Sequence, residues 1–353
     1  MNSVLHLLGP STGGIRRHVA VLASAQEAEG WRVAVAGPSG VMAGLDRDQH
    51  DLAVGAGLGS VRSLRSLRRL GSEVDIVHAH GLKAGWTARA AGLGAKTVLT
   101  VHNLVLAEAA GRSAVVLRPL EKALPGQVAA TIAISTEIAE HLTGTLDRRI
   151  VVIPPVGPSP VVTRSAAEVR AELGISDGMR LVVQVGRLHP QKDVDNLIAA
   201  SRNWPADVVT VVVGEGPDER RLRTVLAETP DAAVHLVGSK PDAPNYLSAA
   251  DVVVSAARWE GFGLVIAEAL RLGRPVVATD VGPVSTMVID GRTGLLVAPE
   301  DPDALGAAVG SLLDDPDRAR RLGAEGARHM EQAFSVSELI DEVEKVYRAV
   351  MDR

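Results

Sequence analysis

The chain has 353 residues, which is long for one domain and fits two. Hydrophobic residues make up 46% of the chain and aromatic residues only 2%, so cores built mainly from Leu, Val and Ala are expected. The net charge of −5 gives no global indication of a nucleic-acid partner. The absence of cysteine excludes disulfide bonds, thiolate metal sites and a cysteine nucleophile.

The start of the chain, MNSVLHLLG, has neither the basic residues nor the apolar length of a signal peptide. Nowhere does the sequence contain about 18 uninterrupted apolar residues, the length that a transmembrane helix needs. Together with the lack of cysteine, these features predict a cytoplasmic protein.

Short runs of β-branched residues alternate with helical patterns along the chain, which is typical of parallel α/β proteins. The sequence predicts six strands in its first half, at residues 4–8, 32–36, 75–79, 97–101, 131–134 and 150–153, and six in its second half, at residues 181–185, 208–213, 234–237, 251–254, 275–278 and 295–297. Two equal sets indicate two Rossmann-like domains rather than one large sheet.

The boundary between the domains is expected at residues 154–160, where four of seven residues are proline and would interrupt either a helix or a strand. We therefore predict a first domain over residues 1–157 and a second over residues 158–334. A last helix is predicted over residues 335–353, and it begins with the spacing of a capping box, Ser335-Val-Ser-Glu338.

A glycine-rich stretch, Gly9-Pro-Ser-Thr-Gly-Gly14, joins the first predicted strand to a helix that runs to about residue 29. It lacks the G-x-G-x-x-G spacing of dinucleotide-binding proteins, which argues against a dehydrogenase. From the residues alone, this stretch is either a ligand-binding loop or only a tight turn between strand and helix.

Histidines end two of the predicted strands, at the carboxyl edge where parallel α/β sheets bind ligands. His78 and His80 lie two residues apart, so strand alternation puts both imidazoles on one side. A two-histidine metal site is one interpretation, although no nearby carboxylate completes it. His102 follows the next strand, either as a ligand-contacting side chain or as a histidine that is simply hydrogen-bonded there.

Residues 61–70 form an amphipathic pattern, with leucines at positions 64, 67 and 70 and arginines at positions 62, 65 and 68. The arginines make either an ordinary solvated helix face or a surface that contacts anionic lipid or an acceptor phosphate. The second alternative would make the protein peripheral to the inner face of the membrane.

The predicted strand at residues 181–185 is followed by two basic residues, Arg187 and Lys192, in the pattern G-R-x-x-x-x-K. A helix is expected to begin between them, near residue 190. One guanidinium, one ammonium and the amides at a helix start would bind a diphosphate without a metal ion. Either base alone would be an ordinary surface charge, so the prediction depends on the pair.

A second loop of this kind, Glu260-Gly-Phe-Gly263, lies between a strand and a helix. The first N–H groups of that helix can bind a phosphate, because the glycines let an anion approach the main chain. Glu260 and Glu268 flank the turn, and a carboxylate accepts hydrogen bonds from sugar hydroxyls. Taken singly, each would also fit an ordinary exposed glutamate.

Together, these residues resemble the retaining glycosyltransferases of family 4. Glu260 and Glu268 stand eight residues apart, as in the E-x7-E element of that family, and the segments GRPVVATD and DGRTGLLV that follow are similar too. Gly14 and His18 resemble the G-G-x-x-x-H element of its first domain. The resemblance extends over residues 9–347.

The resemblance implies the GT-B fold, in which two Rossmann-like domains face a cleft and the last helix crosses back to the first domain. It implies transfer of a sugar, with retention of configuration, from a nucleotide sugar to an acceptor hydroxyl, with a UDP-sugar favoured over GDP-mannose. The first domain would bind the acceptor and the second the donor. No cofactor or metal ion is implied, and we interpret two D-x-D spacings, Asp46/Asp48 and Asp193/Asp195, as chance.

The same resemblance implies roles for the site residues. Arg187 and Lys192 would bind the leaving diphosphate, and Glu268 the ribose hydroxyls. Glu260 and His102 would bind and orient the donor sugar. The expected catalytic residues are His102, Glu260, Arg187 and Lys192, and the expected donor-binding residues are Gly14 near the diphosphate, Gly238 near the base, Gly261, Phe262, Gly263, Leu264 and Glu268.

The acceptor has no motif that we can interpret, so a lipid-linked sugar, a small metabolite and a glycan are all open. Alternative functions on the same architecture are a sugar-nucleotide epimerase, a phosphorylase, and a nucleotide-sugar-binding protein without turnover. The last would be expected to have lost Glu260, Arg187 or Lys192, and all three are present.

Overall fold

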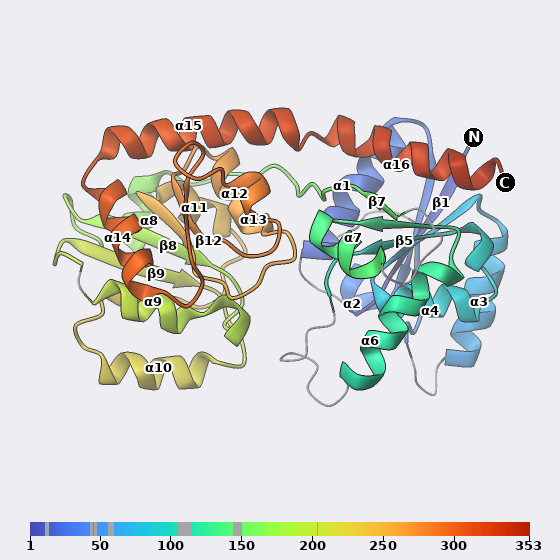
Figure 1. The fold of residues 1–353 in the computed structure, drawn as a ribbon, viewed down its shortest axis with the longest axis horizontal. Helices are drawn as coiled ribbons and strands as arrows, with labels where there is room; N and C mark the ends of the chain where they lie inside the picture. Colours follow the sequence, from blue (N-terminus) through green and yellow to red (C-terminus); the bar gives the residue numbers. More distant parts are fainter. Residues whose placement is uncertain are drawn as a thin grey trace. The chain divides into compact units, whose positions relative to one another are not determined.

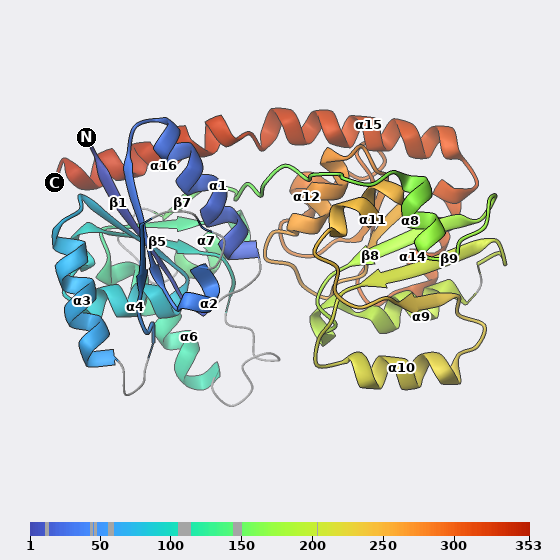
Figure 2. The same cartoon turned by 180° about the vertical axis from the view of Figure 1, so that it is seen from behind.

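The computed structural model describes residues 1–10, 14–42, 45, 48–55, 60–104, 114–143, 150–202 and 204–353. The chain divides into two compact units: the first combines Met1–Pro158 with Phe334–Arg353, and the second is Ser159–Ala333. Each unit is built on a parallel sheet with helices on both faces (Figure 1 and Figure 2). The prediction of two α/β domains with parallel sheets is therefore confirmed.

The described residues of the first unit form a seven-stranded sheet in the order β3-β2-β1-β4-β5-β6-β7. Its strands are β1 (Ser3–Leu8), β2 (Arg32–Gly37), β3 (Asp48–Asp51), β4 (Ile76–His80), β5 (Thr97–Val101), β6 (Ala130–Ala133) and β7 (Ile150–Val152). The central strands β1, β4 and β5 are buried throughout, as expected of apolar runs covered on both faces. The sequence did not predict β3, because its residues DQHD are polar and lie at the edge of the sheet.

The described helices of the first unit are α1 (Gly14–Ala28), α2 (Ser39–Met42), α3 (Ser60–Ser72), α4 (Leu82–Ala90), α6 (Ala114–Ala123), α7 (Thr136–Thr143) and α16 (Val336–Met351), with 3-10 turns η1 (Gly94–Lys96) and η3 (Leu124–Gln127). The last helix, α16, packs against α1, and its Tyr347 is fully buried in the core of this unit. Trp31 Nε1 donates a hydrogen bond of 2.8 Å to Glu344 Oε1 on α16. The hydroxyl of Ser335 accepts from the N–H of Glu338 at 3.1 Å and caps the helix.

The second unit has a six-stranded parallel sheet in the order β10-β9-β8-β11-β12-β13. Its strands are β8 (Arg180–Val185), β9 (Val208–Val213), β10 (Val234–Leu236), β11 (Val252–Ser255), β12 (Val276–Thr279) and β13 (Leu295–Val297). All six strands that the sequence predicts for the second half are present, because short buried valine runs between turns are a clear local signal. The site loops follow β8 and β11, which are neighbours in this sheet.

The helices of the second unit are α8 (Ala166–Glu172), α9 (Val194–Ser201), α10 (Glu219–Glu228), α11 (Ala243–Ala249), α12 (Leu264–Arg271), α13 (Val284–Met287), α14 (Pro302–Leu313) and α15 (Pro316–Ala333), with the 3-10 turn η4 (Pro190–Lys192). α9 and α14 pack together over one face of the sheet, whereas α12 contacts α11 and α15. No helix in the described residues of either unit has the length and apolar character to cross a membrane.

Candidate active site

The loop between β11 and α12 presents its main chain to an anion. α12 begins at Leu264, and Gly263 before it has a φ of +88°, a left-handed conformation that favours glycine. Gly263 is the N-cap residue and makes no side-chain capping hydrogen bond. Helix geometry leaves the first N–H groups without an intrahelical partner, at the positive end of the helix dipole. Phe262 is buried within the loop, next to the main chain of Gly261 and Gly263.

Lys192 and Glu260 form an ion pair between the two predicted donor loops. The Glu260 side chain is 8% exposed and that of Lys192 20%, so water screens their attraction only in part. Lys192 ends η4, and the helix expected near residue 190 begins later, as α9 at Val194. The parallel pairing of β8 and β11 brings these two residues together at one edge of the sheet.

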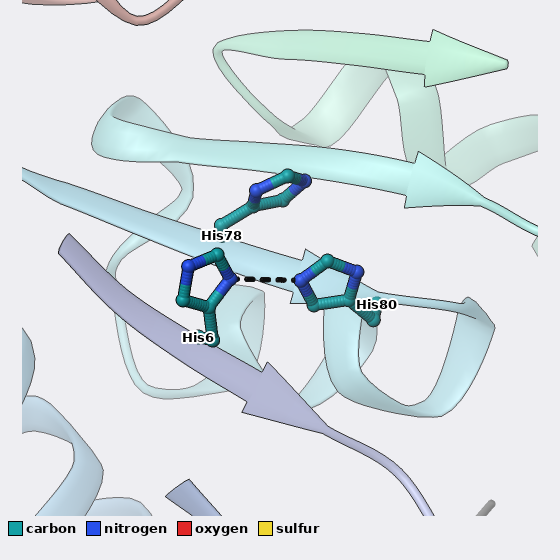
Figure 3. A group of neighbouring side chains, drawn as sticks. All are labelled: His6, His78 and His80. Atoms are coloured by element: carbon teal, nitrogen blue, oxygen red, sulfur yellow. Dashed lines mark hydrogen bonds between the residues drawn. The ribbon is translucent and has the colours of Figure 1, made fainter. Parts of the chain in front are cut away.

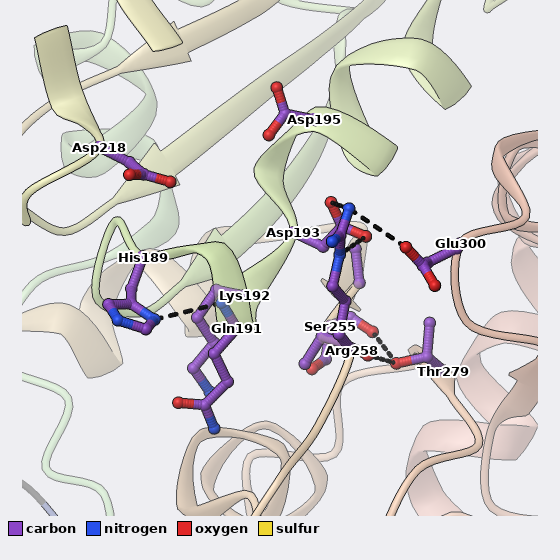
Figure 4. A network of polar contacts seen from close by, with 12 residues as sticks. His189, Gln191, Lys192, Asp193, Asp195, Asp218, Ser255, Arg258, Thr279 and Glu300 are labelled. Carbon is purple, nitrogen blue, oxygen red and sulfur yellow. Dashed lines mark hydrogen bonds and ion pairs between the residues drawn. The ribbon is translucent and has the colours of Figure 1, made fainter. Parts of the chain in front are cut away.

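Gln191 links the same two loops through neutral hydrogen bonds. Its carbonyl accepts from the N–H of Arg258 at 2.8 Å, and its Nε2 donates to the carbonyl of Trp259 at 2.8 Å. Its own N–H donates to His189 Nδ1 at 3.2 Å (Figure 4). These contacts fix the loops on both sides of the Lys192–Glu260 pair. Sequence reasoning missed Gln191, because its partners lie on a different strand-to-helix loop.

Arg187 lies on the first of these loops and is exposed, with no ion pair to any residue that the structure describes. The glycine turn after β9 packs directly against this loop: a Cβ on Gly214 would overlap the carbonyl oxygen of Gly186. Gly214 also donates its N–H to the carbonyl of Gly238 at 2.9 Å. Gly238, the residue expected near the base, has a φ of +76°. The glycines of this region therefore shape the loops that surround Arg187.

Glu268 lies in the second turn of α12 and is only 2% exposed, and Glu260 is 7% exposed. The alternative that both are ordinary exposed glutamates is therefore wrong. A carboxylate buried to this extent needs a cation or several hydrogen bonds around it. Burial lowers the pKa of Arg271, one turn further along the helix, and the charge of Glu268 acts in the opposite direction.

The two expected site residues of the first unit are Gly14 and His102. Gly14 is the first residue of α1 and is exposed, and residues 11–13 before it lie outside the described part of the chain. His102 follows β5 and is 5% exposed. Burial, together with the charge of His18, lowers the pKa of His102 well below its ordinary value. At neutral pH His102 is therefore a neutral group that can both donate and accept a hydrogen bond.

Two family models match the two halves of the chain. The model described as Glycosyltransferase Family 4 matches residues 12–156, and that described as Glycosyl transferases group 1 matches residues 165–329. Over 305 residues the chain is 31% identical to the alpha-maltose-1-phosphate synthase of Mycolicibacterium smegmatis, and the match covers 78% of this chain and 79% of that protein. The chain therefore belongs to the glycosyltransferase family that these two models describe.

The chain is also 34% identical, over 295 residues, to the D-inositol 3-phosphate glycosyltransferase of Nocardia farcinica. That match covers 74% of this chain but only 64% of the length of the relative. Among solved structures, the chain is similar to Anabaena Alr3699/HepE in complex with UDP-glucose, with a TM-score of 0.87, 20% identity and coverage of 99% of this chain and 100% of that one. This likeness confirms the GT-B fold.

In the Asp193/Asp195 spacing, each carboxylate is paired with an arginine. Asp193 pairs with Arg258 at 2.9 Å, and Asp195 pairs with Arg221 at 2.7 Å. Figure 4 shows Asp193 directed at Arg258, beside the loop that carries Lys192. Both carboxylates therefore have a guanidinium partner, and Asp46 of the other spacing lies outside the described residues.

The first unit has a cluster of buried histidines that the sequence showed only in part. His78 and His80 lie on one side of β4, as predicted, with ring centroids 4.2 Å apart. His6 of β1 joins them, and one nitrogen of each of the three rings lies within 4.8 Å of the others (Figure 3). Sequence reasoning missed His6, because its position opposite His78 depends on the pairing of β1 with β4.

Proposed function

We propose that this glycosyltransferase transfers a sugar from a UDP-sugar to an acceptor hydroxyl, with retention of configuration. The observation that carries the proposal is the Lys192–Glu260 pair, which lies on the same sheet edge as Arg187 and the start of α12. This edge combines cations for a diphosphate with a carboxylate for sugar hydroxyls. The UDP-glucose in the complex of Anabaena Alr3699/HepE supports the choice of UDP.

The departing diphosphate gains negative charge as its bond to the sugar breaks. Arg187, Lys192 and the N–H groups of Gly263 and Leu264 stabilise this charge in the proposed mechanism, as fixed donors do in an oxyanion hole. Glu260 binds hydroxyls of the donor sugar, and its pairing with Lys192 directs the ammonium group before the donor arrives. We assign no general base to the protein, because the leaving phosphate can take the proton of the acceptor.

Glu268 is proposed to accept the two ribose hydroxyls of the nucleotide, so the Glu268→Gln variant should bind UDP about tenfold more weakly or worse, since a hydrogen bond to a charged group is worth about 1.5–3 kcal/mol. Isothermal titration calorimetry with UDP measures the loss. Glu228→Gln, at an exposed position on α10, is the matched control and should keep its affinity. Equal UDP affinity in the two variants would remove the ribose assignment.

The names of the relatives bear on the acceptor. One is named for D-inositol 3-phosphate and the other for making alpha-maltose-1-phosphate, and both compounds are phosphorylated small molecules. We propose an acceptor of this chemical class, ahead of a lipid-linked sugar or a larger glycan. Comparing D-inositol 3-phosphate with unphosphorylated inositol as acceptors shows whether the phosphate is required.

The transfer reaction is tested by following UDP release from UDP-glucose with and without D-inositol 3-phosphate. We expect release only with the acceptor present, unchanged by EDTA because the proposed site needs no metal, and a product whose anomeric configuration matches the donor by NMR. An epimerase would change the sugar without releasing UDP, and a phosphorylase would require inorganic phosphate. A binding protein would consume no donor.

The arginine face of α3 is proposed to contact anionic lipid at the inner face of the membrane. Arg62, Arg65 and Arg68 are exposed and have no ion pair with any described residue, whereas Leu67 on the opposite side is buried. Each arginine near an anionic surface contributes about 1 kcal/mol, so Arg65→Glu with Arg68→Glu should reduce partitioning into phosphatidylglycerol vesicles about tenfold or more.

Flotation with phosphatidylglycerol and with phosphatidylcholine vesicles makes this measurement. Arg320→Glu with Arg321→Glu, on the exposed side of α15, is the control for the change in net charge. Absence of binding to either vesicle, or equal binding by the two double variants, would show that the α3 face is an ordinary solvated surface.

A further inference from the structure

A chain of hydrogen bonds joins Gln26 on α1 to His102 beyond β5. Gln26 Oε1 lies 2.7 Å from His6 Nε2, His6 Nδ1 lies 3.0 Å from His80 Nε2, and His80 Nδ1 lies 3.1 Å from His102 Nε2. The three rings are stacked in sequence, with centroids 5.3 and 5.4 Å apart. All four side chains are at most 5% exposed. Figure 3 shows the middle link, between His6 and His80.

The three imidazole rings in this series of hydrogen bonds are neutral. Burial lowers the pKa of both His80 and His102 well below the ordinary value, and neighbouring histidines lower the pKa of His80 further. His6 is fully buried, it hydrogen-bonds an amide and an imidazole, and the ring of His78 lies beside it, so its surroundings disfavour a charge there. A neutral imidazole donates from one nitrogen and accepts at the other. The direction of one hydrogen bond in the series therefore determines the direction of the next.

The amide of Gln26 sets that direction. Its Oε1 can only accept, so His6 donates from Nε2 and accepts at Nδ1. It follows that His80 donates from Nε2 and accepts at Nδ1, and that His102 donates from Nε2. With Oε1 facing His6, this assignment satisfies all three hydrogen bonds. It leaves Nδ1 of His102 without a proton.

The other end of the same amide faces Tyr347 on α16. Gln26 Nε2 donates to the hydroxyl oxygen of Tyr347 at 3.1 Å, and that hydroxyl lies 2.6 Å from His78 Nδ1. His78 Nε2 in turn lies 2.6 Å from Thr100 Oγ1. If Oε1 and Nε2 of Gln26 exchanged places, every hydrogen bond toward His102 and every hydrogen bond toward Thr100 would reverse its direction, with each proton carried by the other atom of the bonded pair. His102 would then carry its proton on Nδ1.

We propose that Gln26 is a positioning residue that acts through His6 and His80 to keep the proton of His102 on Nε2. Nδ1 of His102 is then a bare acceptor. Resting on the proposed function, the use of this acceptor is to receive a hydrogen bond from a hydroxyl of the donor sugar. The tautomer itself is a property of the protein before any ligand binds.

A metal ion held by His6, His78 and His80 is incompatible with this arrangement. The ion would need a lone pair from each of the three rings, directed at one point. The hydrogen-bonded chain instead uses both nitrogens of each ring, with a proton between each bonded pair. The charge of a metal ion would also be buried beside an amide, a phenol and neutral imidazoles. The hydrogen bonds alone account for the cluster.

The tautomer of His102 is measured by nitrogen NMR on the full chain labelled at histidine, without donor, because protonated and bare ring nitrogens resonate in separate ranges. The signals of His102 are assigned by their loss in His102→Asn. We expect a single N–H on Nε2 in the native protein. A proton on Nδ1, or stoichiometric zinc that EDTA removes with a change in the signals of His6 and His80, would overturn the proposal.

Gln26→Leu tests the cause. The variant removes the acceptor of His6 Nε2, and a buried N–H without an acceptor is less tolerated than a bare nitrogen. The direction of the chain should therefore reverse, so that the Nδ1–H form of His102 appears. Thr97→Val, which removes a buried hydrogen bond of 2.8 Å elsewhere on β5, should keep the native tautomer. If Gln26→Leu does not fold, the tautomer of His102 measured in the native protein still supports or overturns the proposal.

A second measurement separates positioning from a general loss of structure. UDP binds to residues of the second unit in the proposed site, so UDP affinity should be equal in Gln26→Leu and the native protein, whereas KM for UDP-glucose should rise severalfold. A native-like His102 tautomer in Gln26→Leu would overturn this inference and leave the proposed transfer reaction intact. Absence of sugar transfer by the native protein would contradict the proposed function and leave the tautomer result standing.

Discussion

Replacing Arg187 and Lys192 together with alanine should weaken the binding of UDP by about a hundredfold or more, since each supplies a charge-assisted hydrogen bond worth about 1.5–3 kcal/mol. Both bases follow β8, and the main chain around them is fixed by Gln191 and by the close glycine turn after β9. They therefore form a preorganised receptor, and their removal should not be offset by movement of other side chains. Isothermal titration calorimetry with UDP measures the effect.

The single variants should differ in stability. Lys192→Ala leaves the carboxylate of Glu260 buried without its cation, which is costly, whereas Arg187 is exposed and pairs with no described residue. We expect a lower Tm for Lys192→Ala and an unchanged Tm for Arg187→Ala. Adding Glu260→Gln to Lys192→Ala should restore Tm without restoring UDP affinity. Arg223→Ala on α10 is the control and should keep native UDP affinity. Native UDP affinity in a folded variant with both Arg187→Ala and Lys192→Ala would contradict the proposed diphosphate site.

Lowering the pH should destabilise this protein before its carboxylates begin to titrate. Burial lowers the pKa of His18 to about 4 and those of His78, His80 and His102 well below their ordinary value. The unfolded chain binds protons at these histidines near pH 6.5, whereas the folded protein does not. The unfolded state therefore holds more protons below that pH, and the free energy of unfolding falls as the pH falls.

The size of this effect follows from the number of histidines. Each contributes a slope of about 1.4 kcal/mol per pH unit between its unfolded and folded pKa, so four of them remove several kcal/mol by about pH 5. Urea unfolding between about pH 7.5 and about pH 4.5 measures the free energy directly. Stability that stays constant through this interval would show that the histidines are already accessible to protons in the folded protein.

The loops after β8 and β11 could be predicted from sequence because their signals are local. Short valine-rich runs mark β8 and β11; a basic pair follows β8 and a glycine turn follows β11, each within a few residues of the strand end. Strand β3 could not be predicted in this way. Its DQHD sequence has no apolar face, since an edge strand needs little burial on either side.

The histidine network depends on long-range structure, and this is why the sequence showed only part of it. His78 and His80 are two residues apart, so their common orientation follows from strand alternation. His6 joins them only because β1 lies between β2 and β4, and Gln26 meets Tyr347 over 321 residues of sequence because α16 packs on α1. No local pattern encodes either contact.

The burial of the two glutamates is a further property that spacing does not contain. E-x7-E places Glu260 in a loop and Glu268 on a helix, and each position alone fits an exposed side chain. The pairing of Glu260 with Lys192 depends on the neighbouring places of β8 and β11 in the sheet. The packing of α12 against α11 and α15 accompanies the burial of Glu268.

The thermal stability of the purified protein with UDP, GDP and ADP, each with and without magnesium, tests the central claim most directly. A ligand at a hundredfold excess over its dissociation constant adds about 2.7 kcal/mol to stability, which is a clear shift in Tm. The proposed site predicts a shift that is largest with UDP, independent of magnesium, and absent in the Arg187→Ala, Lys192→Ala double variant. No shift with any of the three nucleotides, or an equal shift in the double variant, would contradict it.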